Sequence, residues 1–367
     1  MSADPTSLRI LHVNVGGERL QVDGIPDGLR RRMDAQRELG HRPEVIDWRA
    51  FPDESGAELA RRVARTLTGE TPPDVVHFYS VFRPVQAALG ALAGRRGIPY
   101  VVSPASAYAP DALARGRHRK RAFIRAVDGP YVRASRAAVC HTANEVAEVR
   151  AALGTRTPTF IVPNDAPLAR FPQPVWRAAP GRPVLLCLAR HDVWHKGLDV
   201  LAQIAQRLPE ADVVVHGQPD GNDPGRARAL QAAASPNFFL LPPIFDAEKR
   251  SALAGAALYV QTSRYESTSN AVLEAMAAGV PLAVSSYIGE EMHLRRHDAG
   301  LVLDDEPAVA AAQLRAALAD VEQRRRWADA ARRLAARHYD PLHTAQLTID
   351  MYRGQRCPSR TAVLERS

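Results

Sequence analysis

The stretch RYESTSNAVLEAMAAGVPLAV, residues 264 to 284, places Glu266 and Glu274 in an E-x7-E pattern around a run of small polar residues. The run 267–270 consists of residues that favour helix N-caps, and Gly279 is a typical C-terminal stop. The stretch therefore predicts a helix over 271–278. The apolar segment ALYVQTS just before it, residues 257–263, predicts a strand.

Both glutamates are predicted to face a ligand. In open α/β sheets, ligands bind at the carboxyl ends of the strands, and a helix that starts there attracts anions and sugar oxygens. Glu266 lies in the strand-to-helix loop, and Glu274 lies about a turn and a half inside the helix. A carboxylate accepts two strong hydrogen bonds from adjacent hydroxyls, which suits a ribose diol at Glu274 and a sugar ring at Glu266. The alternative for each is an exposed acid that only stabilises the helix N-terminus.

Strand-like runs alternate with helical patterns along the chain, which predicts parallel sheets with right-handed crossovers. The predicted strands lie at 8–15, 42–48, 74–80, 98–104 and 137–143, and again at 184–190, 211–217, 237–244, 257–263, 281–287 and 300–305. Long helical stretches are predicted at 111–134 and 307–338, with a shorter one after Pro341. Between the two series, the Pro-rich segment 160–183 has no periodicity and is interpreted as a linker. At roughly 150 residues per domain, 367 residues predict two domains.

Composition narrows the function classes. A net charge of +8 and a pI near 9.7 favour anionic partners. Aromatic residues make up only 6% of the chain and do not alternate with the basic residues, which argues against a nucleic-acid binder. Three dispersed cysteines have no metal-ligand spacing, and no signal peptide or long apolar segment occurs, so we expect a cytoplasmic protein. The Ala-, Arg- and Pro-rich composition is typical of a GC-rich bacterial source.

Two further segments lie at predicted strand ends. Arg190 follows one strand and Lys196 precedes the next helix, so the two cations are placed to clamp a diphosphate. Gly16 and Gly17 follow the first strand, where backbone can approach a phosphate closely. Each of these signals is weak alone, because surface cations and Gly-Gly turns are common.

Taken together, R-x5-K-G at 190–197 and YESTSNAVLEAMAAGVP resemble the retaining glycosyltransferases of the GT-B fold, glycosyltransferase family 4 (group 1). The resemblance extends over most of the chain. It implies an α/β protein of two Rossmann-like parallel-sheet domains facing a cleft, with C-terminal helices. We expect an acceptor-side domain over 1–170, a nucleotide-sugar-binding domain over 171–340, and a segment 341–367 whose helix returns to the first domain before a frayed tail.

The resemblance also implies roles for individual residues. Glu274 would hold the donor ribose, while Glu266 would meet the donor sugar and orient it. Arg190 and Lys196 would neutralise the diphosphate, which makes them, with Glu266, the expected catalytic residues. The expected donor-binding residues also include Ser267, Thr268 and Ser269 through their N–H groups, Ile244 beside the base, and Gly16 and Gly17 over the phosphates. No metal and no other cofactor is expected, since the two cations and the helix N-termini supply the charge.

Two positions depart from the pattern of the family. Many relatives have His-Gly where this chain has Ala105-Ser106, so an imidazole that could touch the donor sugar is absent. The usual Asn-Gly before the linker is Asn164-Asp165. His12, His77 and His141, at strand ends, are interpreted as structural rather than as replacements for the missing histidine.

The segment 114–125, ARGRHRKRAFIR, concentrates basic residues in the first half of the chain: Arg115, Arg117, Arg119, Lys120, Arg121 and Arg125. It could contact a phosphorylated acceptor or the inner face of an anionic membrane. The alternative is a solvated helix with Phe123 and Ile124 turned inward.

The expected activity is transfer of a sugar from a nucleotide-sugar donor to a hydroxyl acceptor on a natural product, glycolipid or polysaccharide, most simply a hexosyl transfer. The alternatives are a non-catalytic GT-B binding protein, an epimerase or phosphorylase of the same fold, and a nucleic-acid binder.

Overall fold

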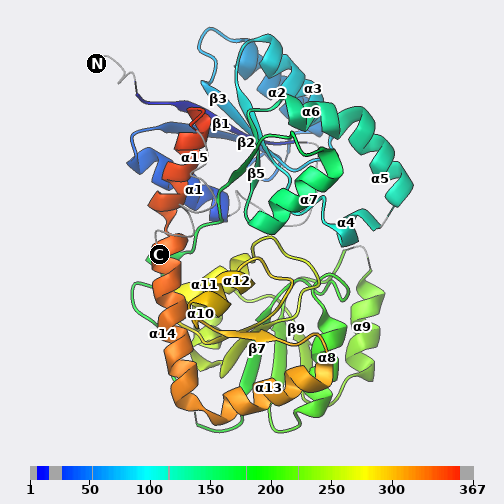
Figure 1. Cartoon of the computed structure of the whole chain (residues 1–367), viewed down its shortest axis with the longest axis vertical. Helices are drawn as coiled ribbons and strands as arrows, with labels where there is room; N and C mark the ends of the chain where they lie inside the picture. Colours follow the sequence, from blue (N-terminus) through cyan, green and yellow to red (C-terminus); the bar gives the residue numbers. More distant parts are fainter. Residues whose placement is uncertain are drawn as a thin grey trace. The chain divides into compact units, whose positions relative to one another are not determined.

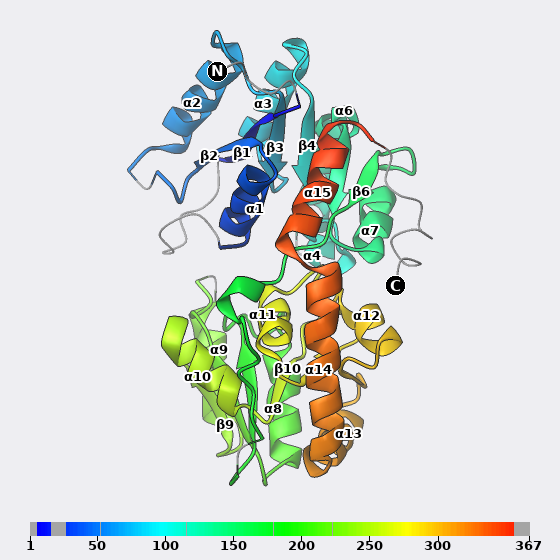
Figure 2. The same ribbon diagram turned by 90° about the vertical axis from the view of Figure 1, so that its left-hand side faces the viewer.

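The computed structural model describes residues 6–15, 27–51, 53–114, 116–178, 180–221 and 223–355. The chain divides into two compact units. Unit 1 comprises Met1–Asp165 with Pro341–Ser367, and unit 2 comprises Ala166–Asp340. Each unit is a twisted parallel sheet with helices on both faces (Figures 1 and 2). These findings confirm the predicted α/β fold class.

Unit 1 has its sheet in the order β2-β1-β3-β4-β5-β6. Alternate residues of each strand face opposite sides, so Leu11 and Val13 pack with α2 and α3 while Ile10 packs with α15. The strands are β1 (Arg9–Asn14), β2 (Arg42–Asp47), β3 (Val75–Tyr79), β4 (Tyr100–Ser103), β5 (Ala137–Cys140) and β6 (Thr159–Ile161). The helices are α1 (Asp27–Glu38), α2 (Gly56–Thr68), α3 (Pro84–Arg95), α4 (Pro110–Ala114), α5 (Arg117–Phe123), a π-helix (Ile124–Asp128), α6 (Gly129–Ala134), α7 (Ala143–Leu153) and α15 (Pro341–Tyr352).

Unit 2 has the order β12-β11-β10-β7-β8-β9. One face packs on α10, α11 and α14, and the other on α8 and α13. The strands are β7 (Val184–Leu188), β8 (Asp212–His216), β9 (Phe238–Leu241), β10 (Leu258–Gln261), β11 (Leu282–Ser285) and β12 (Leu301–Leu303). The helices are a 3-10 turn (Leu168–Arg170), α8 (Leu198–Arg207), α9 (Pro224–Ala233), α10 (Asp246–Gly255), α11 (Asn270–Ala278), α12 (Glu291–Arg296), α13 (Pro307–Ala319) and α14 (Val321–His338).

The structure corrects three local expectations. The first residues of the supposed linker form β6, which pairs with β5; at three residues it is too short to show a period. Gly116, with a φ of 75°, separates α4 from α5 within the stretch expected to be one helix. Asp320 divides the other long stretch, because its side chain accepts a hydrogen bond from the N–H of Gln323 and starts α14.

A buried polar network in unit 1 explains two of the histidines and the role of the last helix. His77 Nδ1 lies 2.7 Å from the hydroxyl of Tyr352 on α15, and His77 Nε2 lies 2.8 Å from the hydroxyl of Ser103. His12 contacts the hydroxyl of Tyr79 at 2.9 Å. Burial holds the pKa of both histidines below their usual range, so they are neutral core residues at pH 7.

Asp165, which replaces the usual glycine of the family pattern, is buried at the end of unit 1. Its carboxylate accepts a hydrogen bond from Arg31 Nε of α1 at 2.5 Å, and its carbonyl accepts a second bond from the same guanidinium. Asp165, at the position where the family pattern has glycine, therefore forms an ion pair that joins the end of this segment of unit 1 to α1. No helix of the described residues has the length and apolar character needed to cross a membrane.

Candidate functional site

Three neighbouring loops of unit 2 converge at one edge of its sheet. They follow β7, β10 and β11, which are adjacent and parallel, so their carboxyl ends share that edge. The loop after β7 carries Arg190 and Lys196, and the loop after β10 carries Glu266. The sequence therefore placed these residues correctly at the carboxyl edge of one sheet.

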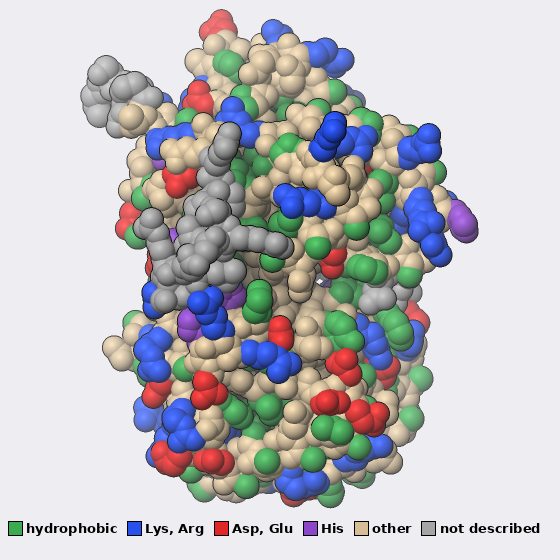
Figure 3. Space-filling model, viewed as in Figure 1, with side chains coloured by type: hydrophobic (Ala, Val, Ile, Leu, Met, Phe, Trp, Pro, Cys, Tyr) green, Lys and Arg blue, Asp and Glu red, His purple; other side chains and the backbone are tan. Residues whose placement is uncertain are grey.

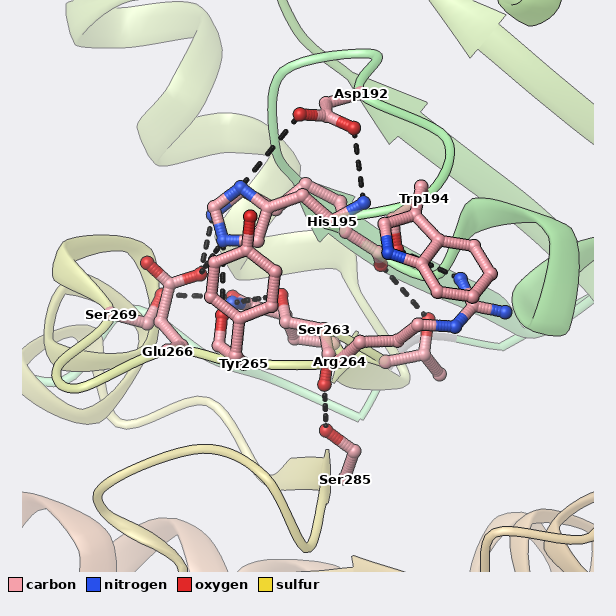
Figure 4. A network of polar contacts seen from close by, with 12 residues as sticks. Asp192, Trp194, His195, Ser263, Arg264, Tyr265, Glu266, Ser269 and Ser285 are labelled. Atoms are coloured by element: carbon pink, nitrogen blue, oxygen red, sulfur yellow. Dashed lines mark hydrogen bonds and ion pairs between the residues drawn. The ribbon is translucent and has the colours of Figure 1, made fainter. Parts of the chain in front are cut away.

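Lys196 and Glu266, 70 residues apart, form an ion pair in which Nζ lies 2.5 Å from Oε2. His195 joins them, because its Nε2 lies 3.7 Å from the same carboxylate oxygen. The ring of His195 stacks on Tyr265 with 4.2 Å between centroids, and its Nε2–H donates to the carbonyl of Tyr265 (Figure 4). The side chains of Lys196 and Glu266 are largely buried, at 12% and 17% exposure, so solvent ions screen their attraction little.

His195 is a site residue that the sequence reasoning missed. Its only sequence signal is its position directly before Lys196. Burial holds its pKa below the usual range and the charge of Lys196 lowers it further, whereas Glu266 and Asp192 oppose that shift. A neutral imidazole at pH 7 is consistent with the hydrogen bond that it donates to a carbonyl.

The backbone of Glu266 is held by the loop after β11. Its N–H donates to the carbonyl of Tyr287 at 3.1 Å, and its carbonyl accepts from the N–H of Gly289 at 2.9 Å. Arg264 binds the loop after β7 and the start of α8: its guanidinium lies over the ring of Trp194 (Figure 4) and donates two 2.8 Å bonds to Asp199. Arg264 thus connects the loop after β10 to the loop after β7 and to α8. Glu266 is held by its backbone bonds to the loop after β11 and by its side-chain ion pair with Lys196.

Helix α11 ends where the sequence predicts and begins at Asn270, one residue before the predicted start. The side chain of Ser269 caps it by accepting from the N–H of Val272, and Gly279 ends it with a φ of 69°. The hydroxyl of Ser269 also donates to Gln261 Oε1 at 2.9 Å, beneath the site. The N-terminus of α11 therefore packs on a buried hydrogen-bonded group of side chains, Ser269, Gln261 and Ser263.

Glu274 has its own cations, which differ from those of Glu266. Both of its oxygens accept from Lys249 Nζ on α10, at 3.1 and 3.3 Å, and Arg170 lies 4.0 Å away. The carboxylate is 13% exposed. Lys249 and Arg170 gave no sequence signal, since neither lies near a motif.

Arg190 and Ile244 lie at the same edge but outside this network. Arg190 is exposed, and it makes no hydrogen bond or ion pair with any residue the structure describes. Ile244 is partly exposed and lines a pocket of about 520 Å³ between α10 and strands β7 and β8. Neither Glu266 nor Glu274 lines that pocket, so the pocket is distinct from the Lys196–Glu266 pair.

Gly197 holds Lys196 in place because no side chain fits there. Its φ is +61°, and a Cβ would lie 2.0 Å from the carbonyl oxygen of Thr262. The loops after β7 and β10 can approach closely only with glycine at this position.

We expect Gly197→Ala to lower the unfolding free energy by more than the roughly 1–3 kcal/mol of left-handed strain alone, because the clash with Thr262 adds to it. Urea denaturation of the full chain measures this. The matched control is Gly97→Ala, where φ is +71° but nothing lies within 4 Å of the new Cβ. Equal losses in the two variants would contradict the close-approach argument.

Glu290 is a buried carboxyl group that the sequence did not reveal. It is 1% exposed, and its Oε2 accepts from the N–H of Ser269 at 3.4 Å. Its Oε1 is buried, and the side chain of Thr268 lies near enough to influence the carboxyl group. Burial, assisted by the charge of Glu266 and opposed by the hydrogen bond from the Ser269 N–H, raises the pKa of Glu290 to about 8. The protonated form of Glu290 therefore predominates at pH 7.

This raised pKa predicts how stability depends on pH. Between the ordinary glutamate pKa and about 8, the folded state holds a proton that the unfolded state has lost, so stability falls as pH rises and levels off above pH 8. We expect Glu290→Gln to remove that fall and to exceed the parent at pH 8 by on the order of a few kcal/mol. Denaturation at pH 5 to 9 tests this, and parallel curves for parent and variant would contradict it.

The remaining sequence candidates lie elsewhere. Gly16, Gly17 and Arg115 lie outside the described residues. Ala105 and Ser106 are in unit 1, both with positive φ (53° and 60°), and the N–H of Ser106 donates to Glu145 at 2.8 Å. No group of three or more His, Cys, Asp or Glu side chains in the described ranges is arranged to hold a metal ion.

Two family models match the chain. The model for glycosyl transferases group 1 matches residues 173–334, and that for a glycosyl transferase 4-like domain matches residues 12–165. A comparison with curated proteins found no match. Among solved structures, HepE of Anabaena in complex with UDP and glucose is similar with a TM-score of 0.71 at 15% identity, covering 94% of this chain and 98% of its own. Sucrose-phosphate synthase of Thermosynechococcus elongatus gives 0.73 at 14% identity, with the same coverage. These likenesses show the fold of two six-stranded parallel sheets.

Proposed function

The chain belongs to the group 1 glycosyl transferases and is a glycosyltransferase of the GT-B fold; from that premise we propose that it moves a sugar from a nucleotide-sugar donor to a hydroxyl acceptor with retention at the anomeric carbon. The observation that carries this proposal is the Lys196–Glu266 ion pair beside the N-terminus of α11. A structural neighbour that binds UDP and glucose adds support for a donor of this class.

In this proposal the leaving diphosphate lies between Lys196 and the exposed Arg190. Glu266 and the loop Ser267–Ser269 contact the donor sugar. Glu274 accepts hydrogen bonds from the two ribose hydroxyls, and the base lies beside Ile244, held mainly by backbone. Lys249 keeps the Glu274 carboxylate in place during binding.

The proposed step breaks the bond between the anomeric carbon and the phosphate oxygen and forms one from the acceptor oxygen on the same face. The acceptor proton passes to the leaving phosphate. The protein supplies charge and position rather than a nucleophile, and Lys196 stabilises the charge that grows on the phosphate. No divalent ion has a part in this scheme, so addition of a chelator is expected to leave the rate unchanged.

The proposal also includes a cytoplasmic location and a peripheral contact with an anionic membrane. The described cysteines Cys140 and Cys187 are free and buried, which suits a reducing compartment. The basic helix α5 supplies the membrane contact, at about 1 kcal/mol per cation near an anionic surface.

A panel of nucleoside diphosphates tests donor binding. At about 100 times the dissociation constant, the cognate diphosphate should add about 2.7 kcal/mol of stability, seen as a rise in Tm. Mass spectrometry of the product from the matching donor with cell extract then tests transfer. Binding without product would indicate a non-catalytic protein of the same fold. Salt-dependent DNA binding with no nucleotide response would favour a nucleic-acid binder.

A further inference from the structure

Unit 1 contains a groove that none of the proposed donor-binding residues lines. It lies between α4, α5, the π-helix and α7, and has a volume of about 680 Å³, within the range of small-molecule sites. We call it the α5 groove. Its floor is apolar and includes Tyr108, Leu113, Ile124 and Ala152, with Ala151 at its exposed side. Tyr108 and Ile124 are almost fully buried, so the floor is continuous with the core of unit 1.

The rim of the α5 groove is basic. Arg117, Arg121, Arg125 and Arg133 line it. The first three are exposed, and none of them forms an ion pair with a described residue. Arg133 donates one bond to the carbonyl of Leu153 at the end of α7. Lys and Arg side chains gather over α5 in Figure 3.

Glu148 of α7 is the carboxyl group among the residues that line the groove. Burial and, to a smaller extent, the charge of Glu145 raise its pKa to about 7. It is therefore partly protonated near neutral pH, which weakens its repulsion of an anion.

An apolar floor with free guanidinium groups at its rim matches a ligand with an apolar chain and an anionic end. Guanidinium groups bind phosphate oxygens in a forked geometry, and several of them suit a group with two or more charged oxygens. The apolar floor offers few partners for sugar hydroxyls, which disfavours a second sugar site. We propose that the α5 groove binds a single lipid molecule that carries a phosphate headgroup, with the phosphate at the arginines and the chain along the floor.

This inference goes beyond donor binding, because the groove lies wholly within unit 1. It also differs from a general attraction to anionic membranes, which needs the charges but no cavity. The two are separated by filling the cavity while leaving the charges in place.

The test is calorimetric titration of the full chain, without donor, using octyl phosphate below its micelle concentration. Inorganic phosphate and octanol are the comparison ligands. We expect octyl phosphate to bind at least tenfold more tightly than inorganic phosphate, and octanol to give no measurable binding. Equal affinity for octyl phosphate and inorganic phosphate would overturn the proposal.

Two pairs of variants locate the site. Ala151→Trp fills the groove from its exposed side and should remove the advantage of the octyl chain, whereas Ala147→Trp, exposed on the same helix outside the groove, should not. Arg121→Gln with Arg125→Gln should weaken binding by about thirtyfold, at about fivefold per cation. Arg61→Gln with Arg65→Gln, exposed on α2 at the same spacing, should leave it unchanged.

Each variant is first checked for parent-like circular dichroism and Tm. If Ala151→Trp binds octyl phosphate as the parent does, the site is a charged surface and the groove proposal is wrong. If the α2 pair weakens binding as much as the α5 pair, binding is non-specific and the proposal is also wrong.

Discussion

Replacing Lys196 by methionine is expected to lower kcat for sugar transfer by about 10²- to 10³-fold, with little change in donor KM. Methionine keeps much of the side-chain length but removes the charge. Negative charge on the phosphate increases as the bond to the sugar breaks, so a cation there stabilises the transition state more than the bound donor. Initial rates at saturating donor measure the effect.

Because Lys196 also pairs with Glu266, a lower kcat in Lys196→Met could arise from a displaced Glu266 rather than from a lost contact with the phosphate. A double variant separates the two causes. If Lys196 only positions Glu266, then Lys196→Met and Glu266→Gln each cost as much as the double variant. If Lys196 also contacts the leaving phosphate, the double variant is slower than either one. The structural control is Lys249→Met, since Lys249 also pairs with a glutamate in unit 2 but should change donor KM and not kcat. A parent-like kcat for Lys196→Met would end the catalytic assignment.

Replacing Glu274 by alanine is expected to raise donor KM by roughly 10- to 100-fold while kcat stays within a few-fold of the parent. A 10- to 100-fold rise corresponds to about 1.4–2.7 kcal/mol, the net contribution of about one charge-assisted hydrogen bond to the ribose diol. The loss falls on ground-state binding because the ribose lies away from the reacting carbon. Steady-state kinetics with varied donor measure it.

Nucleotides that lack a ribose hydroxyl test whether Glu274 contacts the ribose diol. The parent should bind a 2′-deoxynucleoside diphosphate more weakly than the ribose form, and Glu274→Ala should bind the two equally. Glu322→Ala is the matched control, since Glu322 is a helical glutamate paired with Arg325 on the exposed surface of unit 2. If Glu274→Ala still discriminates between the two sugars as the parent does, Glu274 does not contact the diol.

The elements of the site that rest on short-range signals were predictable. The Ser269 cap and the Gly279 stop lie within one helix, so local preference alone predicts α11. Alternation of apolar strands and helices predicts parallel sheets, and parallel strands place Lys196 and Glu266 at one edge. Elements with weak local signals were missed: β6 has three residues, and α12 has six.

Other properties of the site required contacts between distant segments. The cation beside Glu274 is Lys249, from a different helix, and the carboxyl group beneath Ser269 is Glu290, from a different loop. The raised pKa of Glu290 depends on how deeply the folded chain buries it, which is not a property of neighbouring residues. The α5 groove likewise lies where Gly116 and the π-helix interrupt a stretch that was predicted as one helix.

The sequence by itself determined the two sheets, the helix that begins after Glu266, and the edge where Lys196 and Glu266 lie. Periodicity and capping act over a few residues, so they can be read directly from the chain. Only the tertiary structure decided that Lys196 pairs with Glu266 and Lys249 with Glu274, that the carboxyl group of Glu290 is buried, and that a groove lies beside α5. Those outcomes depend on packing between distant segments, such as those of Lys196 and Glu266, 70 residues apart, or Arg31 and Asp165, 134 residues apart, and no local pattern encodes that approach.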